Sequence, residues 1–412
     1  MPPVEAGYGG YPPRSKGRLP LVRDVFDPAR MAPAHRQVFE QVRENAKLPF
    51  AGITTDGRLR TSLFGIADEG LDIGPVLRAA DDLLDLLSAD QRQAVMHPIG
   101  AQEWRLWTNA YPVWEPHGLL LEDVPQQCRD AVLALVTACL SVRGAREVRD
   151  CMRLNAVLGE VVQDYRETLT EWMYRFSLFG MPDSGQPWGW QLIGHHLDLH
   201  CFVLGRQMVL TPAFLGAEPR IADRGPYAGI RLFDAEMERG LTLVRSLDDL
   251  QQGAILCPSM LSRDLPPELR HRTEGRMRSV RGGDNLVLPY EGVCAADMSA
   301  GQRALLTAVI EAYIGRLPSA QAAFRAAQIE RHYGETYFAW VGTVADNAPF
   351  YYKIHSPVVL IEFDCHAGVF LANDEPEQFH VHTVVRTPNG NDYGRDLLRQ
   401  HHARDHANRR GR

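Results

Sequence analysis

The hydrophobic pattern of this chain changes its period near residues 180–183, and this change constrains the fold more than any other feature. Before it, apolar residues recur at helical spacing, as they do over 76–87 and 146–179. Gly180 and Pro182 then end the helical pattern together. The segments that follow with strand-like patterns are 188–205, 338–343, 351–363 and 380–386. We therefore expect an α+β protein, with a helical N-terminal half packed on a mainly antiparallel sheet built from the middle and C-terminal segments.

This pattern also suggests how the chain is organised. Residues 1–20 are rich in Gly, Pro and Tyr without periodicity, so a disordered arm is expected there. The remaining regions are a mainly helical one over 21–182, an α+β one over 183–400 that carries most of the histidines, and a basic tail over 401–412. Further helices are expected over 233–251 and 301–332. We expect one large folded unit.

Two helix starts carry the same local signal. Ser88 with Gln91, and Ser299 with Gln302, each have the spacing of a capping box, in which the two side chains bond each other's backbone N–H groups. The similarity between the two places is short. We interpret it as coincidence rather than as an internal repeat.

Composition excludes several classes of function. The 412 residues are 45% hydrophobic and carry a net charge of −7, so no global electrostatic case exists for binding nucleic acid or an anionic membrane. No apolar run is long enough to span a bilayer, and the N-terminus has no apolar segment of the signal-peptide type. The seven cysteines form no CxxC pair. These features predict a reduced, soluble, cytoplasmic protein, and a homo-oligomer is compatible with them.

The distribution of the fifteen histidines points to metal chemistry. His380 and His382 are two residues apart in a predicted strand, and a strand directs such residues to the same face. Two imidazoles placed in this way can chelate one transition-metal ion. An HxH pattern alone is weak, because buried histidines also occur simply as hydrogen-bonded core residues, which is the role we expect for His355.

A second group of histidines precedes this one. His195, His196 and His200 lie in the segment GHHLDLH. If the segment is extended, His196 and His200 share a face with Asp198; if it is helical, His196 and His200 share a face at i, i+4. Either conformation allows chelation. The alternative is a purely structural role, since histidines on a sheet also bond backbone carbonyls.

Carboxylates and an arginine complete the candidate site. Glu362, Asp364 and His366 alternate onto one face of a strand that is expected to neighbour the His380 strand. Arg386 and Asp392 flank a Pro-Asn-Gly turn after that strand. A guanidinium there could bind an anionic group of a substrate.

Several sharper motifs are excluded by the residues themselves. Val384 stands where the histidine-triad hydrolases need a third imidazole, and no glutamate follows His382 at the spacing of a cupin site. The chain has no GxSxG elbow, and it lacks the glycine-rich loops that bind nucleotides.

Four longer segments resemble a bacterial and fungal family catalogued as a domain of unknown function. They are WGWQLIGHHLDLHCFVLGRQMVLTPAFLGAEP, DNLVLPYEG, YYKIHSPVVLIEFD and HVHTVVRTPNGNDYGRDLLRQHH. The resemblance covers most of the chain from about residue 30 and brings no reaction with it. It implies that the shared landmarks are His195, His196, Glu362, Asp364, His380, His382, Arg386, Asn389, Asn391 and Asp392. His200 departs from the family pattern, so we assign it a place outside the ligand set.

These observations lead to a functional hypothesis. The expected protein is a metal-dependent enzyme in which His195 or His196, with His380 and His382, binds a divalent ion, preferably zinc. Glu362 or Asp364 serves as a further ligand or general base, with Arg386 and Asp392 nearby, and the reaction is hydrolysis of a small carbonyl-containing or anionic substrate. Iron in the same site would indicate an oxygenase instead. The competing hypothesis is a binding or scaffold protein whose histidines are structural.

Overall fold

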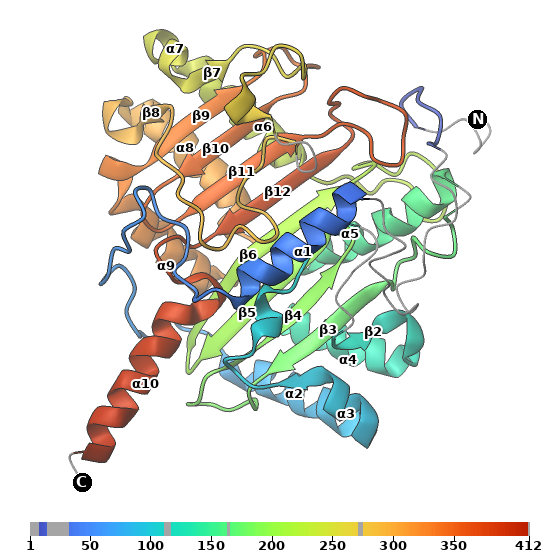
Figure 1. Cartoon of the computed structure of the whole chain (residues 1–412), viewed down its shortest axis with the longest axis vertical. Coiled ribbons are helices and arrows are strands. Elements are labelled where there is room, and N and C mark those ends of the chain that lie inside the picture. The colour runs from blue at the N-terminus through green and yellow to red at the C-terminus, as the bar shows by residue number, and fades with distance from the viewer. Residues whose placement is uncertain (1–7, 15–32, 111–116, 163–164, 271–274, 411–412) are drawn as a thin grey trace.

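A twelve-stranded sheet forms the centre of the molecule in the computed structural model, which describes residues 8–14, 33–110, 117–162, 165–270 and 275–410 (Figure 1). The α-helices are Pro33–Lys47 (α1), Ile73–Leu86 (α2), Ala89–Val95 (α3), Gln126–Ala138 (α4), Val142–Val161 (α5), Asp234–Ser246 (α6), Gln251–Ala254 (α7), Ala300–Ile314 (α8), Ser319–Glu330 (α9) and Arg395–Arg410 (α10). The strands are Met96–His97 (β1), Leu119–Leu120 (β2), Tyr174–Phe179 (β3), Trp188–Gly194 (β4), Leu197–Leu204 (β5), Gln207–Ala217 (β6), Ile255–Cys257 (β7), Val293–Cys294 (β8), Tyr337–Val341 (β9), Tyr351–His355 (β10), Leu360–Cys365 (β11) and Val381–Arg386 (β12).

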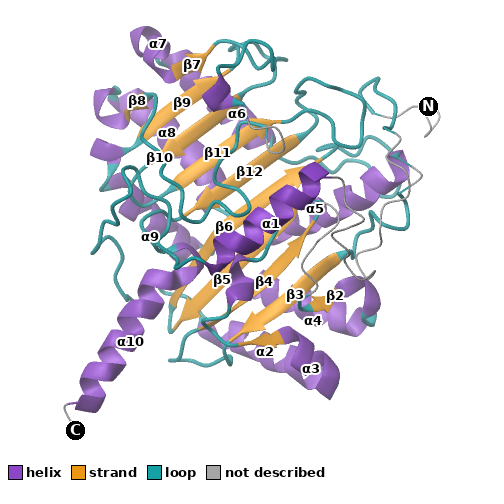
Figure 2. Cartoon of the chain, viewed as in Figure 1, coloured by secondary structure: helices purple, strands orange, loops and turns teal. Residues whose placement is uncertain are grey.

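The sheet is mainly antiparallel. Its strand order is β1-β3-β4-β5-β6-β12-β11-β10-β9-β7, with β2 paired to β3 and β8 paired to β9. Only the pairs β1·β3 and β7·β9, near the two edges, are parallel among the strands described. Helix α1 crosses one face of the sheet, while α5, α6 and α8 lie against the other (Figure 2). The expected α+β class, with a mainly antiparallel sheet, is confirmed.

The two halves of the chain repeat one topology. From α2 to β6, the order is two helices, two short strands, two helices and four strands, and the order from α6 to β12 is the same. The sheet order is symmetric about the central pair β6·β12. Each half thus supplies one half of the sheet, and the two halves are joined by antiparallel pairing of their last strands.

Strand register shows that this repeat extends to single residues. Leu119 pairs with Phe176 in the first half, and Val293 pairs with Phe338 in the second. The N–H of Gly180 donates to the β1 residue His97 at 2.8 Å, and the N–H of Gly342 donates to the β7 residue Cys257 at 2.9 Å. Phe176 and Gly180 are separated along the chain by as many residues as Phe338 and Gly342, so β3 and β9 contact their two short neighbouring strands at the same spacing.

The repeat is a feature that our sequence analysis did not identify, and it is not the similarity between the two capping boxes. Both capping boxes are formed, at the starts of α3 and α8. These helices occupy non-equivalent places in the two halves, so the similarity between the boxes is indeed coincidental. The repeat is carried by topology and register, and hydrophobic periodicity detects neither.

The boundary between helix and strand also differs from the expectation over 146–179. Helix α5 ends at Val161, and residues 174–179 form strand β3. All six residues of β3 are buried, because the strand lies inside the sheet with helices over it. A short apolar run that is buried on both sides has no period of two, so its pattern is also compatible with a helix.

Two predicted strands are hairpins instead. The segment 188–205 turns at His195 and His196, between β4 and β5. The segment 351–363 turns after His355, where the N–H of Ser356 donates to Val359 O at 2.8 Å. The first of these turns matters most for the histidines, since it places His196 at one end of the sheet.

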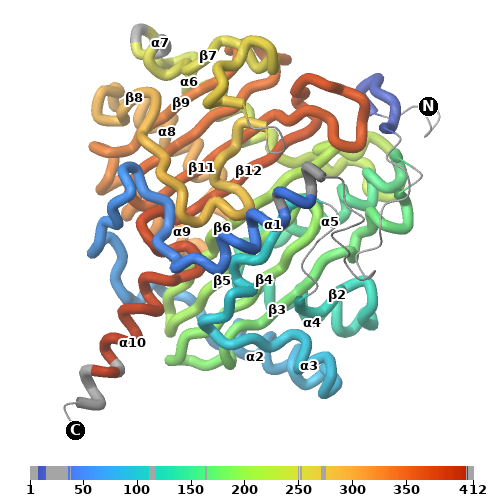
Figure 3. Tube along the Cα trace, viewed as in Figure 1, coloured from blue at the N-terminus to red at the C-terminus, as the bar shows by residue number. Residues whose placement is uncertain are grey.

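The described N-terminal segment 8–14 and helix α10 lie at opposite sides of the molecule (Figure 3). In the predicted N-terminal arm, the described residues 8–14 pack beside the loop 366–380: the N–H of Arg14 donates to Phe370 O at 2.8 Å, and the Tyr11 hydroxyl donates to Glu377 at 3.0 Å. The remainder of the arm lies outside the described residues. In the predicted basic tail, α10 continues to Arg410 and points away from the sheet. Among the described helices, none has the length and apolar character to cross a bilayer.

Gly292 provides a test of the repeat. Its φ is +86°, and a Cβ there would lie 2.0 Å from Phe338 O, just as a Cβ on Gly118 would lie 2.4 Å from Phe176 O. We expect Gly292→Ala to lower the free energy of unfolding by about 2–4 kcal/mol, through left-handed strain and overpacking. Gly334→Ala is the control, because nothing lies within 4 Å of its Cβ position. Equal stability of the two variants in urea denaturation would contradict this account.

Candidate metal centre

The turn between β4 and β5 positions His196. Its φ is +64°, in the left-handed region that non-glycine residues seldom adopt. Backbone bonds hold this conformation: the N–H of His196 donates to Asn109 O at 3.0 Å, and its carbonyl accepts from the N–H of Gly216 at 2.8 Å. The imidazole is thereby fixed at the end of the central strands, with only 4% of its surface exposed.

The other two imidazoles come from β12 and the residue before it. His382 pairs with Gly216 of β6, so it lies directly beside the turn that carries His196. His380 lies two residues earlier and faces the same way, as alternation along a strand requires. Both are buried. The predicted HxH pair is therefore brought together with His196.

Three ring nitrogens converge at this point. His380 Nε2 lies 3.3 Å from His196 Nε2 and 3.0 Å from His382 Nε2. One ligand atom from each of the three residues lies within 4.8 Å of the other two, which is close enough for all three to bind one ion. Among the described His, Cys, Asp and Glu side chains, these three form the group that could hold a metal. We call it the histidine triad.

Gly216 makes room for the triad. A Cβ at this position would lie 2.9 Å from His382 Cδ2 and 3.1 Å from His196 Cδ2. The strand could not carry a larger residue here without displacing one of the two rings. A glycine in a buried central strand otherwise weakens the strand, so its presence here is explained by the close approach of the imidazoles.

The surroundings keep the imidazoles of His196 and His382 neutral. Burial lowers the pKa of His196 and of His382 well below 6.5, and the neighbouring histidines lower both further. A neutral imidazole retains a lone pair on one nitrogen, which is the form that binds a metal. The electrostatics of the site therefore agree with its geometry.

A carbonyl orients one member of the triad. His380 Nδ1 lies 2.8 Å from Ala367 O, a contact that places a proton on Nδ1 and leaves the Nε2 lone pair directed at the other two rings. Glu218 Oε2 lies 3.8 Å from the same Nδ1. This carboxylate is itself held by the N–H groups of residues 369–371. Such outer contacts are typical of histidines that bind metals.

His195 and His200 lie outside the triad. His195 Nδ1 is 2.8 Å from Asn155 Oδ1, and the ring stacks on His196 with 3.9 Å between centroids. His200 Nδ1 is 2.8 Å from Pro212 O, and its ring packs against Trp107 and Tyr393. Of the two adjacent histidines in the turn, His196 thus lies next to the HxH pair, while the ring of His195 stacks on the ring of His196.

His366 lies closer to the triad than its place in the sequence suggested. Its ring centroid is 4.8 Å from that of His380 and 4.5 Å from that of His382. Its Nδ1 lies 2.8 Å from Ala367 O. We did not select His366 as a site residue, although the alternation of Glu362, Asp364 and His366 along one face was the signal that could have identified it.

The two candidate carboxylates have different surroundings. Asp364 pairs in register with His382, and its Oδ1 lies 3.1 Å from Arg276 Nε. Glu362 accepts hydrogen bonds from Ser279 N at 2.8 Å, from Arg278 N at 3.0 Å and from the Tyr351 hydroxyl at 2.8 Å. It also bonds the Ser279 hydroxyl. Glu362 therefore fastens a loop to the sheet, whereas Asp364 lies beside the triad.

Arg386 lies in a buried ion-pair network. Its Nε is 2.8 Å from Asp392, its Nη2 is 2.6 Å from Asp284, and its Nη1 donates to Ser279 O at 2.8 Å. Asp392 also accepts from the N–H of Thr387 at 2.7 Å. Burial raises the pKa of Asp392, and the charge of Arg386 partly offsets this effect. Arg386 and Asp392 thus bond each other and the protein groups around them.

The asparagines of the turn after β12 are bonded to backbone as well. Asn389 Nδ2 donates to Pro357 O at 2.9 Å, and its Oδ1 accepts from the N–H of Arg60 at 3.2 Å. Asn391 Oδ1 accepts from the N–H of Leu397 at 3.4 Å. These contacts hold the turn and the start of α10 in place.

Comparison with known proteins places the chain in a family. A family model described as a protein of unknown function (DUF3500) matches residues 69–395, well over half of the chain. The chain belongs to this family. The resemblance of the four sequence segments is thereby confirmed. No curated protein and no solved structure matches the chain.

The DUF3500 region coincides with the repeated fold. It begins shortly before α2, the first helix of the first half, and ends at Arg395, just after β12. It therefore contains both halves of the sheet and all three histidines of the triad. In this chain, α1 and most of α10 lie outside the matched region.

The buried network around Arg386 leads to a first prediction for this region. Arg386→Met leaves Asp284 and Asp392 without their shared cation, so we expect a loss of about 3–5 kcal/mol in the free energy of unfolding. Arg245→Met, which breaks the exposed pair with Asp346, should change it by about 1 kcal/mol or less. Urea denaturation measures both. An Arg386→Met protein with unchanged stability would contradict a structural role for this arginine.

Buried histidines outside the triad predict a dependence of stability on pH. Burial lowers the pKa of His117 to about 4, and those of His200 and His355 to about 3, against 6.5 in the unfolded chain. Below pH 6.5 the unfolded state therefore binds more protons than the folded state, and stability falls as the pH falls. The expected loss is about 2 kcal/mol per histidine at pH 5.

His355→Phe isolates one of these contributions. Within the described part of the chain, neither ring nitrogen of His355 has a hydrogen-bond partner, and the ring packs against Tyr290 with centroids 4.8 Å apart. The variant should lose less stability than the parent between pH 7 and pH 5. The measurement is urea denaturation at both pH values with a chelator present. Identical losses would show that His355 does not titrate as described.

Proposed function

We propose that this protein is a metal-dependent enzyme, and that it is a hydrolase with the histidine triad as its metal centre. The observation that carries this proposal is the convergence of three buried Nε2 atoms, 3.0 and 3.3 Å apart, from two distant segments of the chain. A catalytic zinc site commonly has three protein ligands and one open position. The substrate that we propose is a small molecule with a carbonyl group.

The surroundings of the triad favour zinc over iron. Non-haem iron oxygenases use two histidines and one carboxylate. Here the nearby carboxylates have other contacts, since Asp364 pairs with Arg276 and Glu218 accepts three backbone N–H groups. Three imidazoles form a ligand set that suits zinc. An iron oxygenase remains the alternative enzyme, and it would require Asp364 to leave Arg276.

The residues around the triad then have separate tasks. A bound zinc ion would supply a water molecule that ionises near neutral pH. Asp364, in register with His382, is the carboxylate that we propose as general base, because Glu362 already accepts hydrogen bonds from Ser279 N and from the Tyr351 hydroxyl. His380 keeps its Nε2 lone pair available by directing Nδ1 at Ala367 O. Arg386 is assigned no contact with substrate, because all three of its nitrogens have buried partners.

A non-catalytic role is the second candidate. The Nε2 separations of 3.0 and 3.3 Å are also hydrogen-bond distances, so the same three rings could bond each other in a binding or scaffold protein. The two candidates differ in one measurable property. Only the first requires a stoichiometric metal ion.

Two coarser properties support the compartment and the class of partner that we propose. All seven cysteines are free thiols, six of them buried, which is typical of a protein in a reducing compartment. The net charge of −7 argues against nucleic acid as a partner. We propose a cytoplasmic protein that acts on a small molecule and that could assemble with further copies of itself.

Metal content tests the proposal directly. We expect about one transition-metal ion per chain by elemental analysis of protein purified without an affinity tag or added metal. Replacing His380 and His382 together by Ala should remove it. The matched control replaces His401 and His402, an adjacent histidine pair on α10 whose second member is exposed, and should retain the ion.

The outcomes separate the candidates. Zinc in the parent and its loss in the first variant would support hydrolysis, and iron would support the oxygenase. A folded parent that takes up no ion when titrated with zinc or iron would refute both enzyme hypotheses. Retention of the ion by the His380/His382 variant would place the metal elsewhere in the protein.

A further inference from the structure

A pocket lies on the face of the central strands that points away from the triad. Along β6, Gly216 and Phe214 face the histidines, so Leu215 and Ala213 face the other side. There they line a pocket together with residues of α5, α8 and α9. We call this space the inter-repeat pocket, because both halves of the chain contribute to it.

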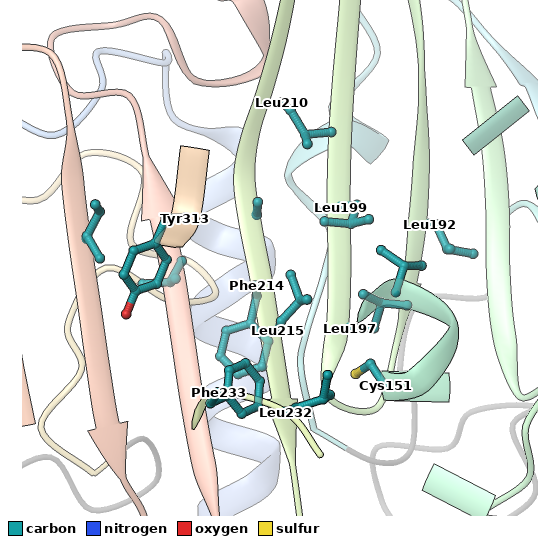
Figure 4. Close-up of a cluster of buried hydrophobic side chains, with 14 of the residues drawn as sticks. Cys151, Leu192, Leu197, Leu199, Leu210, Phe214, Leu215, Leu232, Phe233 and Tyr313 are labelled. Atoms are coloured by element: carbon teal, nitrogen blue, oxygen red, sulfur yellow. The ribbon is translucent and has the colours of Figure 1, made fainter. Parts of the chain in front are cut away.

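The wall of the inter-repeat pocket is mainly apolar. Figure 4 shows Leu199, Leu210 and Leu215 on neighbouring strands of this wall, with Tyr313 from α8 nearby. Val209, Leu210 and Ala213 each keep 8–9% of their surface exposed, although β6 is paired on both sides, whereas Phe214 on the opposite face keeps none. Interfaces between structural units are where small-molecule sites commonly occur.

Two arginines line this apolar wall, and their partners differ. Arg316 is neutralised, because its Nε lies 2.7 Å from Glu147 and its Nη2 lies 2.6 Å from Glu236. Arg325 has no carboxylate within 4 Å among the residues that the structure describes. Its hydrogen-bond partners are neutral: Val358 O at 3.1 Å, Thr387 Oγ1 at 3.4 Å and the amide of Gln328.

The one carboxylate on the same wall is tied elsewhere. Glu69 accepts from Gln207 Nε2 at 2.9 Å and from the N–H of Met208 at 3.3 Å. These bonds hold it to the start of β6, beyond ion-pair distance of Arg325. Burial lowers the pKa of Arg325, and the charges of Glu69 and Asp392, which are not in contact with it, offset this effect only in part. A bound anion would offset the remaining effect.

From this arrangement we infer that the inter-repeat pocket binds a medium-chain monocarboxylate, with the carboxylate on Arg325 and the alkyl chain along Leu210, Ala213 and Leu215. A guanidinium matches a carboxylate with two parallel hydrogen bonds. The apolar wall gains from covering the chain. The inference does not rest on the triad, because it uses the opposite face of the sheet.

Three probes of equal length test the ligand class on the unaltered protein. Titration calorimetry should show octanoate binding at about one molecule per chain. Octanol, which has the same chain and no charge, should bind at least tenfold more weakly, because a hydrogen bond to a charged group is lost. Octylammonium should not bind, since its charge repels that of Arg325. Absence of octanoate binding, or equal binding of octanol, would overturn the inference.

Two variants locate the site. Arg325→Met should weaken octanoate about tenfold or more and leave octanol unchanged, while Arg399→Met on exposed α10 should affect neither. Ala213→Phe fills the pocket and should abolish binding of both probes. Undiminished octanoate binding by folded Ala213→Phe protein would place the ligand elsewhere and refute the inference, even if Arg325→Met fails to fold. Replacing His380 and His382 by Ala should leave octanoate binding intact, whatever it does to metal content.

Discussion

The antiparallel pairing of β6 with β12 is the constraint on which the rest of the structure depends. It is the only strand pairing between the two halves of the repeat in the described sheet. Its register sets His382 beside Gly216, and the N–H of Gly216 in turn bonds the carbonyl of His196. A shift of one residue would turn His382 to the opposite face and separate it from His196. The histidine triad is therefore a product of the junction between the halves.

The repeat contains two equivalent turns, and the histidine triad lies at one of them. The turn at His195 and His196 in the first half corresponds to the turn at Pro357 and Val358 in the second. There the carbonyls of the turn accept from Asn389 and Arg325. One turn thus contributes an imidazole to a candidate metal centre, while its counterpart holds the end of β12 and the guanidinium of the pocket. Equivalent backbones carry different chemistry because their side chains differ.

Much of the triad could be predicted because its signal is local. The spacing of His380 and His382 needs only the alternation of a strand, and the GHH segment supplied the third candidate. The choice between His195 and His196 could not be made, because it depends on a left-handed turn and on Asn155, which comes from a distant helix. The alternation of Glu362 and Asp364 was equally local. What separates them is Ser279 and Tyr351, which bond one and not the other, and no pattern within the strand reveals such partners.

The same reasoning applies to Arg386 and to the repeat itself. A free arginine after a histidine-bearing strand suggests a substrate contact, and only the fold shows that Asp284, more than one hundred residues earlier, occupies its guanidinium. A polar side chain is available for chemistry when its donors or acceptors are not already used, and that balance is a property of the whole structure. Arg325 differs from Arg386 in that its hydrogen-bond partners among the described residues are neutral groups and not carboxylates. Three imidazoles direct lone pairs at one point, and one cation faces an apolar wall, on opposite sides of a single pair of strands. Because side chains alternate across that pair, a substitution on one face can be made without touching the other, which makes the two candidate sites independent both structurally and experimentally.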